Sequence, residues 1–142
     1  MDYLESYRKI VKGSGVIALA TSVNDMPNVR IVNFCCDKEN PSVLYFSTGN
    51  DNPKVIEFNE NNRVAFTTIP TDLNDTPHIR SHSAVVQKSD KTLDDLKNLF
   101  LEHSPGLAEM FEMAGAYLSV YEIHIKEATV IAGMEDIGTV SF

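Results

Sequence analysis

Four side chains that can bind an anion lie close together in the sequence: Arg30, Ser47, Thr48 and Lys54. A planar guanidinium and an ammonium both hold phosphate oxygens, and hydroxyl groups add further hydrogen bonds. Lys54 follows Asn52-Pro53, which is a typical start of a helix because asparagine caps the end and proline fits the first position. Free backbone N–H groups at such an end attract an anion. This combination favours a phosphate site.

Both cations also have an ordinary structural explanation. A lysine at the start of a helix can extend its ammonium into water without any ligand. Arg30 shares its strand face with Val32 and Phe34, so its guanidinium needs a partner, which is either a phosphate or one of the twenty acidic side chains. The residues alone leave these two alternatives open.

Short apolar or alternating runs, separated by polar turns, predict the strands that hold these side chains. Such spacing favours an antiparallel arrangement. The predicted strands cover residues 16–21, 29–36, 43–48, 63–69, 80–87 and 117–126, with 128–132 as a further candidate. Helices are predicted over 2–12, after Asn52, after Thr92 and from Ser104 to Gly115. Between them, 70–77 is a polar loop, and the tail at 133–142 is predicted to be irregular.

These elements predict a mainly β fold, with six to seven antiparallel strands closed into a small barrel and a few helices. One domain is expected to cover residues 1–142. Several predicted strands, such as 16–21 and 117–125, are apolar on both faces. One face fills the barrel, and the other needs cover from helices or from a second subunit. We therefore expect a homodimer.

Composition excludes several classes of partner. Twelve basic and twenty acidic residues give a net charge of −8, and the basic residues are scattered, so nucleic acid is not expected as a partner. No apolar run approaches the length of about 20 residues that spans a bilayer, so no membrane association is expected. The sequence begins Met1-Asp2-Tyr3 without the pattern of a signal peptide, which predicts a cytoplasmic protein.

Familiar catalytic and metal-binding motifs are not found in the sequence. The four histidines have no metal-ligand spacing with cysteine or carboxylate residues, so no metal site is predicted: His78, His82, His103 and His124. Neither a phosphate-binding loop nor a dinucleotide fingerprint occurs. The neighbouring Cys35 and Cys36 point to opposite faces of a strand, which favours one buried thiol and one that faces a neighbouring element over a redox pair.

The order of the motifs resembles the pyridoxamine 5′-phosphate oxidase-like flavoproteins, which share an FMN-binding split β-barrel. The resemblance extends from the apolar strand at 16–21 to about residue 130. The motifs that carry it are Pro27-Asn28-Val29-Arg30-Ile31-Val32, Leu44-Tyr45-Phe46-Ser47-Thr48, Lys54 and Asn62-Arg63-Val64-Ala65-Phe66. Each motif is common by itself, but their order and spacing are typical of this family.

The resemblance implies a homodimer with FMN sites at the subunit interface. It implies that the FMN phosphate is held by Arg30, Lys54, Ser47 and Thr48. It also implies that the backbone along the isoalloxazine ring is that of Ile31, Val32 and Asn33. The expected function is that of an FMN-dependent oxidoreductase acting on a small-molecule substrate or reductant. Deazaflavin in place of FMN, a non-enzymatic flavin- or haem-binding module and a cofactor-free dimer are the alternatives.

The chain departs from the family pattern in three respects. In Arg80-Ser81-His82-Ser83-Ala84, His82 stands where a glycine is expected, so its side chain would approach or contact the flavin. We take His82 as the candidate proton donor. The chain also lacks tryptophan and ends in the acidic Met134-Glu135-Asp136-Ile137 region, so oxidation of pyridoxamine phosphate itself is not expected.

Overall fold

The computed structural model describes residues 2–70 and 77–142. Its helices are α1 (Tyr3–Gly13), α2 (Pro53–Glu60), α3 (Leu93–His103) and α4 (Ala108–Ala114), with short 3₁₀ helices at Pro105–Leu107 and Gly115–Tyr117. Its strands are β1 (Val16–Val23), β2 (Met26–Asn33), β3 (Cys35–Cys36), β4 (Val43–Gly49), β5 (Arg63–Thr68), β6 (His78–Lys88), β7 (Leu118–Ile131) and β8 (Ile137–Ser141). The predicted loop at 70–77 falls almost wholly outside the described residues.

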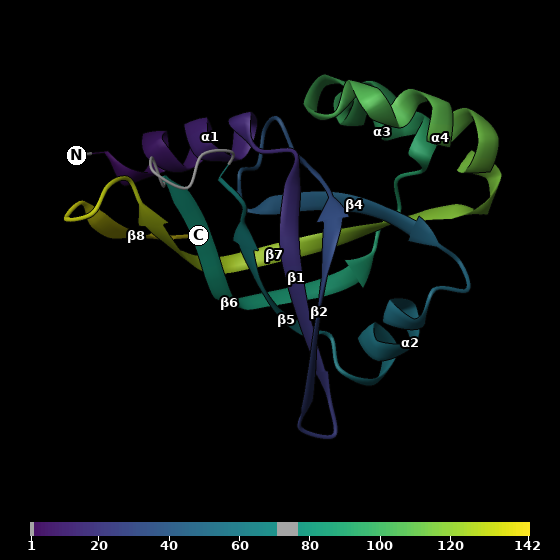
Figure 1. The fold of residues 1–142 in the computed structure, drawn as a ribbon, viewed down its shortest axis with the longest axis horizontal. Coiled ribbons are helices and arrows are strands. Elements are labelled where there is room, and N and C mark those ends of the chain that lie inside the picture. The colour runs from purple at the N-terminus through teal and green to yellow at the C-terminus, as the bar shows by residue number, and fades with distance from the viewer. Residues whose placement is uncertain (1, 71–76) are drawn as a thin grey trace.

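The described strands form one antiparallel sheet in the order β2-β1-β5-β6-β7-β4-β3, and β8 pairs with the far part of β7. β2 and β3 stand at opposite ends of this order, yet only Phe34 separates them in the sequence. The amide of Phe34 still donates to Gly15, just before β1 (3.3 Å), whereas Cys35 already pairs with Tyr45 in β4. The sheet therefore curls into a barrel, and the chain changes partner at Phe34 (Figure 1).

The mainly β, antiparallel barrel predicted from the sequence is confirmed, and the structure adds detail. The predicted strand 29–36 is divided at Phe34, because its two parts pair with different neighbours. The candidate strand 128–132 continues β7 without a break. The prediction of an irregular tail is wrong, since a turn in which the amide of Asp136 donates to Gly133 (3.3 Å) returns the chain to pair as β8.

A continuous apolar core fills the barrel. Inward-facing residues alternate along the strands, as in β1, where Ile17 and Leu19 are fully buried and Ala18 is half-buried on the outer face. Phe46 of β4 lies at the centre of an aromatic group, with its ring centroid 5.8 Å from that of Phe58 in α2 and 5.8 Å from that of Tyr121 in β7. This aromatic group ties α2 to the barrel interior.

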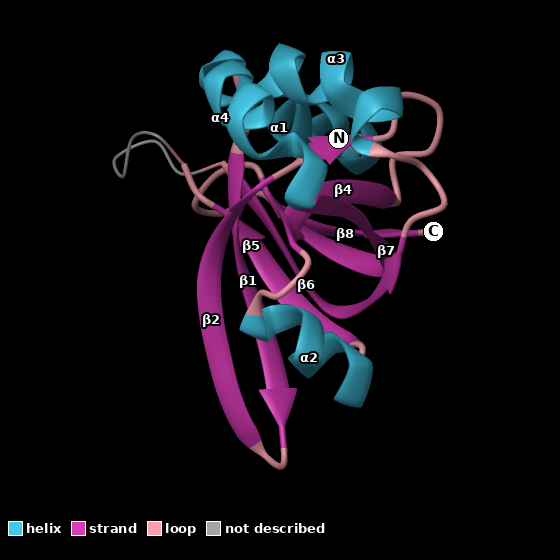
Figure 2. Cartoon of the chain, turned by 90° about the vertical axis from the view of Figure 1, so that its right-hand side faces the viewer, coloured by secondary structure: helices cyan, strands magenta, loops and turns pink. Residues whose placement is uncertain are grey.

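A second apolar core lies outside the barrel, under α3 and α4. Phe100 and Phe111 of these helices pack in the same cluster as Val43 and Tyr45, which are the outward-facing residues of β4. Figure 2 shows α1, α3 and α4 gathered at one end of the barrel, while α2 lies apart from them. Cover by helices, which the apolar outer faces of the strands predicted, is therefore found on the β4 side.

The described residues show neither a membrane-spanning helix nor a metal cluster. None of the described helices is both long enough and apolar enough to cross a membrane. Within residues 2–70 and 77–142, no group of three or more histidine, cysteine or carboxylate side chains is placed to hold a metal ion. Both cysteines are free thiols: Cys35 is buried, and Cys36 is half-buried with its thiol directed at the carbonyl of Pro41 (3.7 Å).

Candidate functional site

Arg30 lies on the inward face of β2, near the start of α2. Its Nη2 atom pairs with Oε2 of Glu57 at 2.6 Å, and its Nη1 atom donates to Oγ1 of Thr21 (2.8 Å) and to the carbonyl of Leu19 (3.3 Å). The sequence left a phosphate and a carboxylate open as the partner of Arg30. In the structure, the partner is the carboxylate of Glu57. These bonds fix the guanidinium between β1, β2 and α2.

Glu57 also accepts hydrogen bonds from side chains of β1 and β2. The hydroxyl of Thr21 donates to Oε2 in a very short contact, and Nδ2 of Asn28 donates to Oε1 at 3.1 Å. The Thr21 hydrogen bond is the largest cause of a lowered pKa for Glu57, and those from Asn28 and Arg30 add to it. Sequence reasoning missed Glu57, although it follows Lys54 by one helical turn and so shares its side of α2.

Replacing Glu57 with glutamine should destabilise the protein by about 1 kcal/mol at pH 7, because a partly exposed ion pair and its hydrogen bonds contribute about that much. The lowered pKa of Glu57 means that this contribution is complete above the ordinary glutamate pKa of about 4.3 and is lost as the pH falls through the folded-state value. The difference in stability between the wild type and Glu57→Gln should therefore shrink as the pH falls below about 4.3 in urea titrations.

Glu60→Gln is the matched control for this experiment. Glu60 is an exposed glutamate on the same helix and takes part in no ion pair with the described residues. Its replacement should leave stability within about 0.5 kcal/mol across the pH range. A Glu57→Gln deficit of equal size at pH 3 and pH 7 would contradict the assignment of a charged Glu57.

Lys54 is the second residue of α2, as the sequence predicted. Its amide donates to the capping oxygen of Asn52 at 3.1 Å. Its ammonium forms no ion pair with any residue that the structure describes. Burial lowers the pKa of Lys54, the charge of Arg30 lowers it further, and Glu57 offsets part of this effect. The charges of Arg30 and Glu57 therefore both act on the ammonium of Lys54.

Ser47 and Thr48 lie at the end of β4, and neither makes a described hydrogen bond to Arg30 or Lys54. Neighbouring residues of a strand point to opposite faces of the sheet. The hydroxyls of Ser47 and Thr48 therefore cannot both bind the same phosphate group from one face. Thr48 is buried on the inward face, and its Oγ1 has no hydrogen-bond partner among the described residues. An unpaired buried hydroxyl is costly and needs an explanation.

β2 carries the three residues predicted to lie along the ring. Val32 points into the core, whereas Ile31 is 57% exposed and Asn33 is exposed on the outer face. β2 pairs only with β1 in the described sheet, so alternate N–H and C=O groups along its other edge are open to a ligand. The strand therefore offers both a free backbone edge and an apolar outer face.

The outer face beside β2 is hollowed by small residues. Ala18, Ala20 and Ala65, on neighbouring strands, line a shallow cavity of about 310 Å³. Val29 stands at one side of this cavity and is 63% exposed, and His82 stands at the other. His82 is also exposed to solvent, so it lies at the rim of an apolar surface rather than within the core.

An antiparallel barrel that opens where β2 gives way to β3, with helices gathered at one end, defines the class of split-barrel proteins. Within this class, the chain belongs to the family described as pyridoxamine 5′-phosphate oxidase-like, whose model matches residues 10–137. The resemblance carried by the motifs of β2, β4, α2 and β5 is thereby confirmed.

Solved structures share this fold at low sequence identity. A haem-binding protein from Mycobacterium smegmatis has a TM-score of 0.78 at 12% identity, covering 99% of this chain and 58% of that protein. A NimC/NimA family protein from Clostridium acetobutylicum has a TM-score of 0.71 at 23% identity, with coverages of 99% and 94%. General stress protein 26 from Bacillus anthracis has a TM-score of 0.68 at 18% identity, with both chains covered completely at 100%.

These likenesses show the fold and not the ligand. This chain spans 58% of the length of the M. smegmatis haem-binding protein, so that protein has a large part with no counterpart here. No curated protein sequence matches the chain. What the site binds must therefore be argued from its residues.

Proposed function

We propose that this protein is a homodimeric FMN-binding flavoprotein that acts as an oxidoreductase on a small-molecule substrate. The observation that carries the proposal is that two cations, Arg30 and Lys54, lie near each other beside α2. Lys54 forms no ion pair with a described residue. Arg30 and Lys54 together exceed the single charge of Glu57. Burial, and then the charge of Arg30, lower the pKa of Lys54, and an anion bound beside the two cations offsets both effects.

The chemistry of these groups fits the phosphate of FMN. Arg30 has five N–H donors, of which the described bonds occupy three, so two are free for phosphate oxygens. The positive end of α2 adds to the attraction. The unpartnered hydroxyl of Thr48 provides a further donor at the end of β4, whereas Ser47 points to the other face.

The outer face of β2 fits the flat ring of the same cofactor. A planar aromatic system packs against apolar side chains such as Ile31 and Val29 and hydrogen-bonds through its edge to free backbone groups of the strand. These side chains are too exposed to bury a ring by themselves. A second subunit placed over this face would cover both the ring and the exposed side chains, which is the reason for proposing a homodimer.

Bound FMN would supply electron and hydride transfer, and the chain would supply position and protons. Arg30 and Lys54 hold the phosphate end, and β2 sets the orientation of the ring. His82, at the rim of the cavity beside β2, is the proposed proton donor, because histidine exchanges protons near neutral pH.

Replacing His82 with glycine should slow the reoxidation of reduced FMN by a quinone acceptor, a step that takes up a proton, by about 100-fold, the lower end of what general acid catalysis contributes, while FMN affinity stays within about threefold. Stopped-flow absorbance of the flavin measures both quantities. His124→Gly, which removes the other histidine near this part of β6 and β7, is the control. Unchanged reoxidation kinetics in His82→Gly would rule out a role for His82 as proton donor.

The decisive test of the proposed function is the absorbance spectrum of the purified protein, followed by titration with FMN. We expect the two visible bands of oxidised flavin. Saturating FMN at 100 times its Kd should stabilise the native state by about 2.7 kcal/mol, which raises the thermal midpoint by roughly 5–15 °C. A colourless protein whose midpoint does not respond to FMN would reject the proposal and support a cofactor-free barrel.

A second candidate is a non-enzymatic haem-binding module on the same dimeric barrel. It is favoured by the high structural similarity to the haem-binding protein from M. smegmatis, with a TM-score of 0.78. The same spectrum separates the two candidates, because haem gives a Soret band and flavin does not. A flavin spectrum that no reductant bleaches would instead indicate storage or sensing of flavin.

A further inference from the structure

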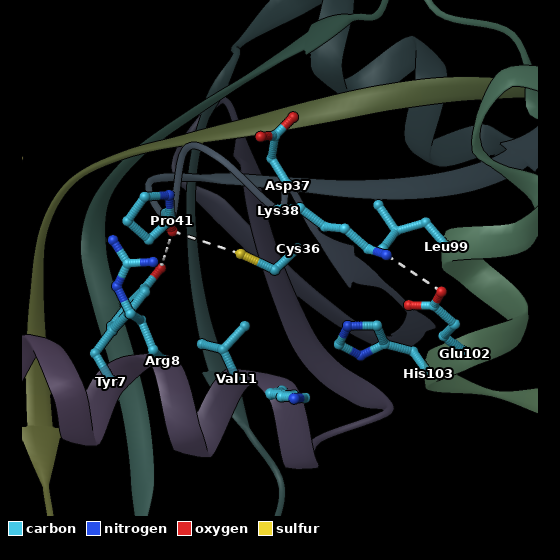
Figure 3. Close-up of a pocket in the computed structure, with 11 residues that line it drawn as sticks. Tyr7, Arg8, Val11, Cys36, Asp37, Lys38, Pro41, Leu99, Glu102 and His103 are labelled. Atoms are coloured by element: carbon cyan, nitrogen blue, oxygen red, sulfur yellow. Dashed lines mark hydrogen bonds and ion pairs between the residues drawn. The ribbon is translucent and has the colours of Figure 1, made fainter.

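A second cavity, of about 430 Å³, lies between α1, the turn that follows β3, and α3. Figure 3 shows the side chains that project into it from these three elements. It shares no residue with the group around Arg30 and Lys54. Its volume falls in the range of about 300–1,000 Å³ that small-molecule sites occupy.

The walls of this cavity are fixed by hydrogen bonds. The hydroxyl of Tyr7 donates to the carbonyl of Pro41 at 2.6 Å, and the thiol of Cys36 points at the same carbonyl at 3.7 Å. Oδ1 of Asp37 accepts from the amide of Asn40 at 2.8 Å, which closes the turn after β3. A preformed cavity binds a ligand without first having to order its own walls.

The charges around the cavity do not cancel. Among its lining residues, Lys38 and Glu102 pair with each other at 3.2 Å. Arg8 and Lys12 lie one turn apart on α1, are exposed, and form no ion pair with the described part of the chain. Although the chain has a net charge of −8, these two unpaired cations give the rim of the cavity a local excess of positive charge.

Asp37, the remaining charged residue of the cavity, is engaged by groups outside it. Its Oδ2 atom accepts from the hydroxyl of Tyr45 at 2.6 Å and lies 3.7 Å from the ammonium of Lys91. Neither Tyr45 nor Lys91 lines the cavity. The carboxylate is therefore held by other partners, and Arg8 and Lys12 determine the sign of the charge that a ligand meets.

The floor of the cavity is apolar and unreactive. Val11 is 2% exposed, and Leu99 lies across from it on α3. Burial raises the pKa of the Cys36 thiol to about 12, so this side chain is a neutral thiol and not a nucleophile. Nδ1 of His103 is 3.1 Å from the carbonyl of Ser14, which can only accept, so Nδ1 carries the proton and Nε2 remains for a ligand.

We propose that this cavity binds a small organic anion, with one carboxylate or phosphate group against Arg8 and Lys12 and an apolar body of about one aromatic ring over Val11 and Leu99. The site is independent of the proposed FMN site, since the two share no side chain. A ligand there contacts α1 and α3 at once and so links the two helices.

The test uses the ¹⁵N-labelled full chain, with phenyl phosphate as the anionic probe and benzyl alcohol as a neutral probe of similar size. Phenyl phosphate should shift the amide signals of 8–12, 36–38 and 99–103. Benzyl alcohol should bind at least about tenfold more weakly, since it lacks the charge that Arg8 and Lys12 attract. The variant Arg8→Ala/Lys12→Ala should lose phenyl phosphate affinity by at least about tenfold.

Two variants make the result specific. Lys9→Ala/Lys88→Ala removes the same charge from exposed positions that do not line the cavity and should leave affinity within about twofold. Arg8→Lys/Lys12→Arg keeps both charges and should retain binding. The proposal is overturned if phenyl phosphate shifts only signals near Arg30 and Lys54, if benzyl alcohol binds equally well, or if no saturable shift appears up to about 10 mM. FMN affinity of Arg8→Ala/Lys12→Ala should not change.

Discussion

Replacing Arg30 and Lys54 together with alanine should weaken FMN binding by at least about 100-fold and change riboflavin binding by less than about threefold. Hydrogen bonds to charged groups contribute about 1.5–3 kcal/mol each, and losing two of them costs at least about 3 kcal/mol, which corresponds to this factor. Riboflavin has the same ring without the phosphate, so it does not use these cations. Fluorescence quenching of either ligand on binding measures both affinities.

The design of this experiment must account for Glu57. Arg30→Ala leaves the Glu57 carboxylate without its cation at 2.6 Å, and that free charge would itself repel a phosphate. The triple variant that adds Glu57→Gln removes this repulsion and should still bind FMN at least about 30-fold more weakly than the wild type. Lys9→Ala/Lys88→Ala is the charge-matched control. Equal losses for FMN and riboflavin would falsify the placement of the phosphate.

Phe46→Ala should destabilise the protein by about 3–5 kcal/mol, the usual cost of removing a buried phenylalanine side chain. Phe46 is fully buried, and its ring lies 5.8 Å from those of both Phe58 and Tyr121, so its loss leaves a cavity that these large rings cannot fill. Urea unfolding followed by circular dichroism measures the change. Because Phe58 belongs to α2, the helix that carries Lys54 loses support at the same time.

Tyr117→Ala is the control for this substitution. Tyr117 is an aromatic residue that is 73% exposed, so its removal should change stability by no more than about 0.5 kcal/mol. A Phe46→Ala variant that binds FMN normally at low temperature, but unfolds earlier, would separate stability from function. A stability loss below about 1 kcal/mol would contradict the central position of Phe46 in the core.

The parts of the fold that sequence could predict depend on short-range pattern. Alternation in β7, the Asn52-Pro53 start of α2 and the apolar runs of β1 and β2 each lie within one segment. The position of Lys54 in the first turn of α2 was predictable for the same reason, because it depends only on the neighbouring Asn52-Pro53. The family resemblance then set the predicted site on β2, β4 and α2.

The parts that sequence could not predict depend on residues far apart in the chain. Glu57 is one of twenty acidic residues, and only the packing of α2 against β1 selects it as the partner of Arg30. The break at Phe34 follows from closure of the barrel, because Asn33 still pairs with Val16 of β1 whereas Cys35 pairs with Tyr45 of β4. The cavity beside Arg8 needs both α1 and α3, which no local pattern relates.

β7 has a consequence for synthesis of the protein. It pairs with β6 along one edge and with β4 and then β8 along the other, and it follows both β4 and β6 in the sequence. While the chain leaves the ribosome, the edges of β4 and β6 that β7 later covers therefore remain unpaired. Such edges readily pair with other chains. The danger of aggregation is thus concentrated in the interval between the emergence of β4 and that of β7.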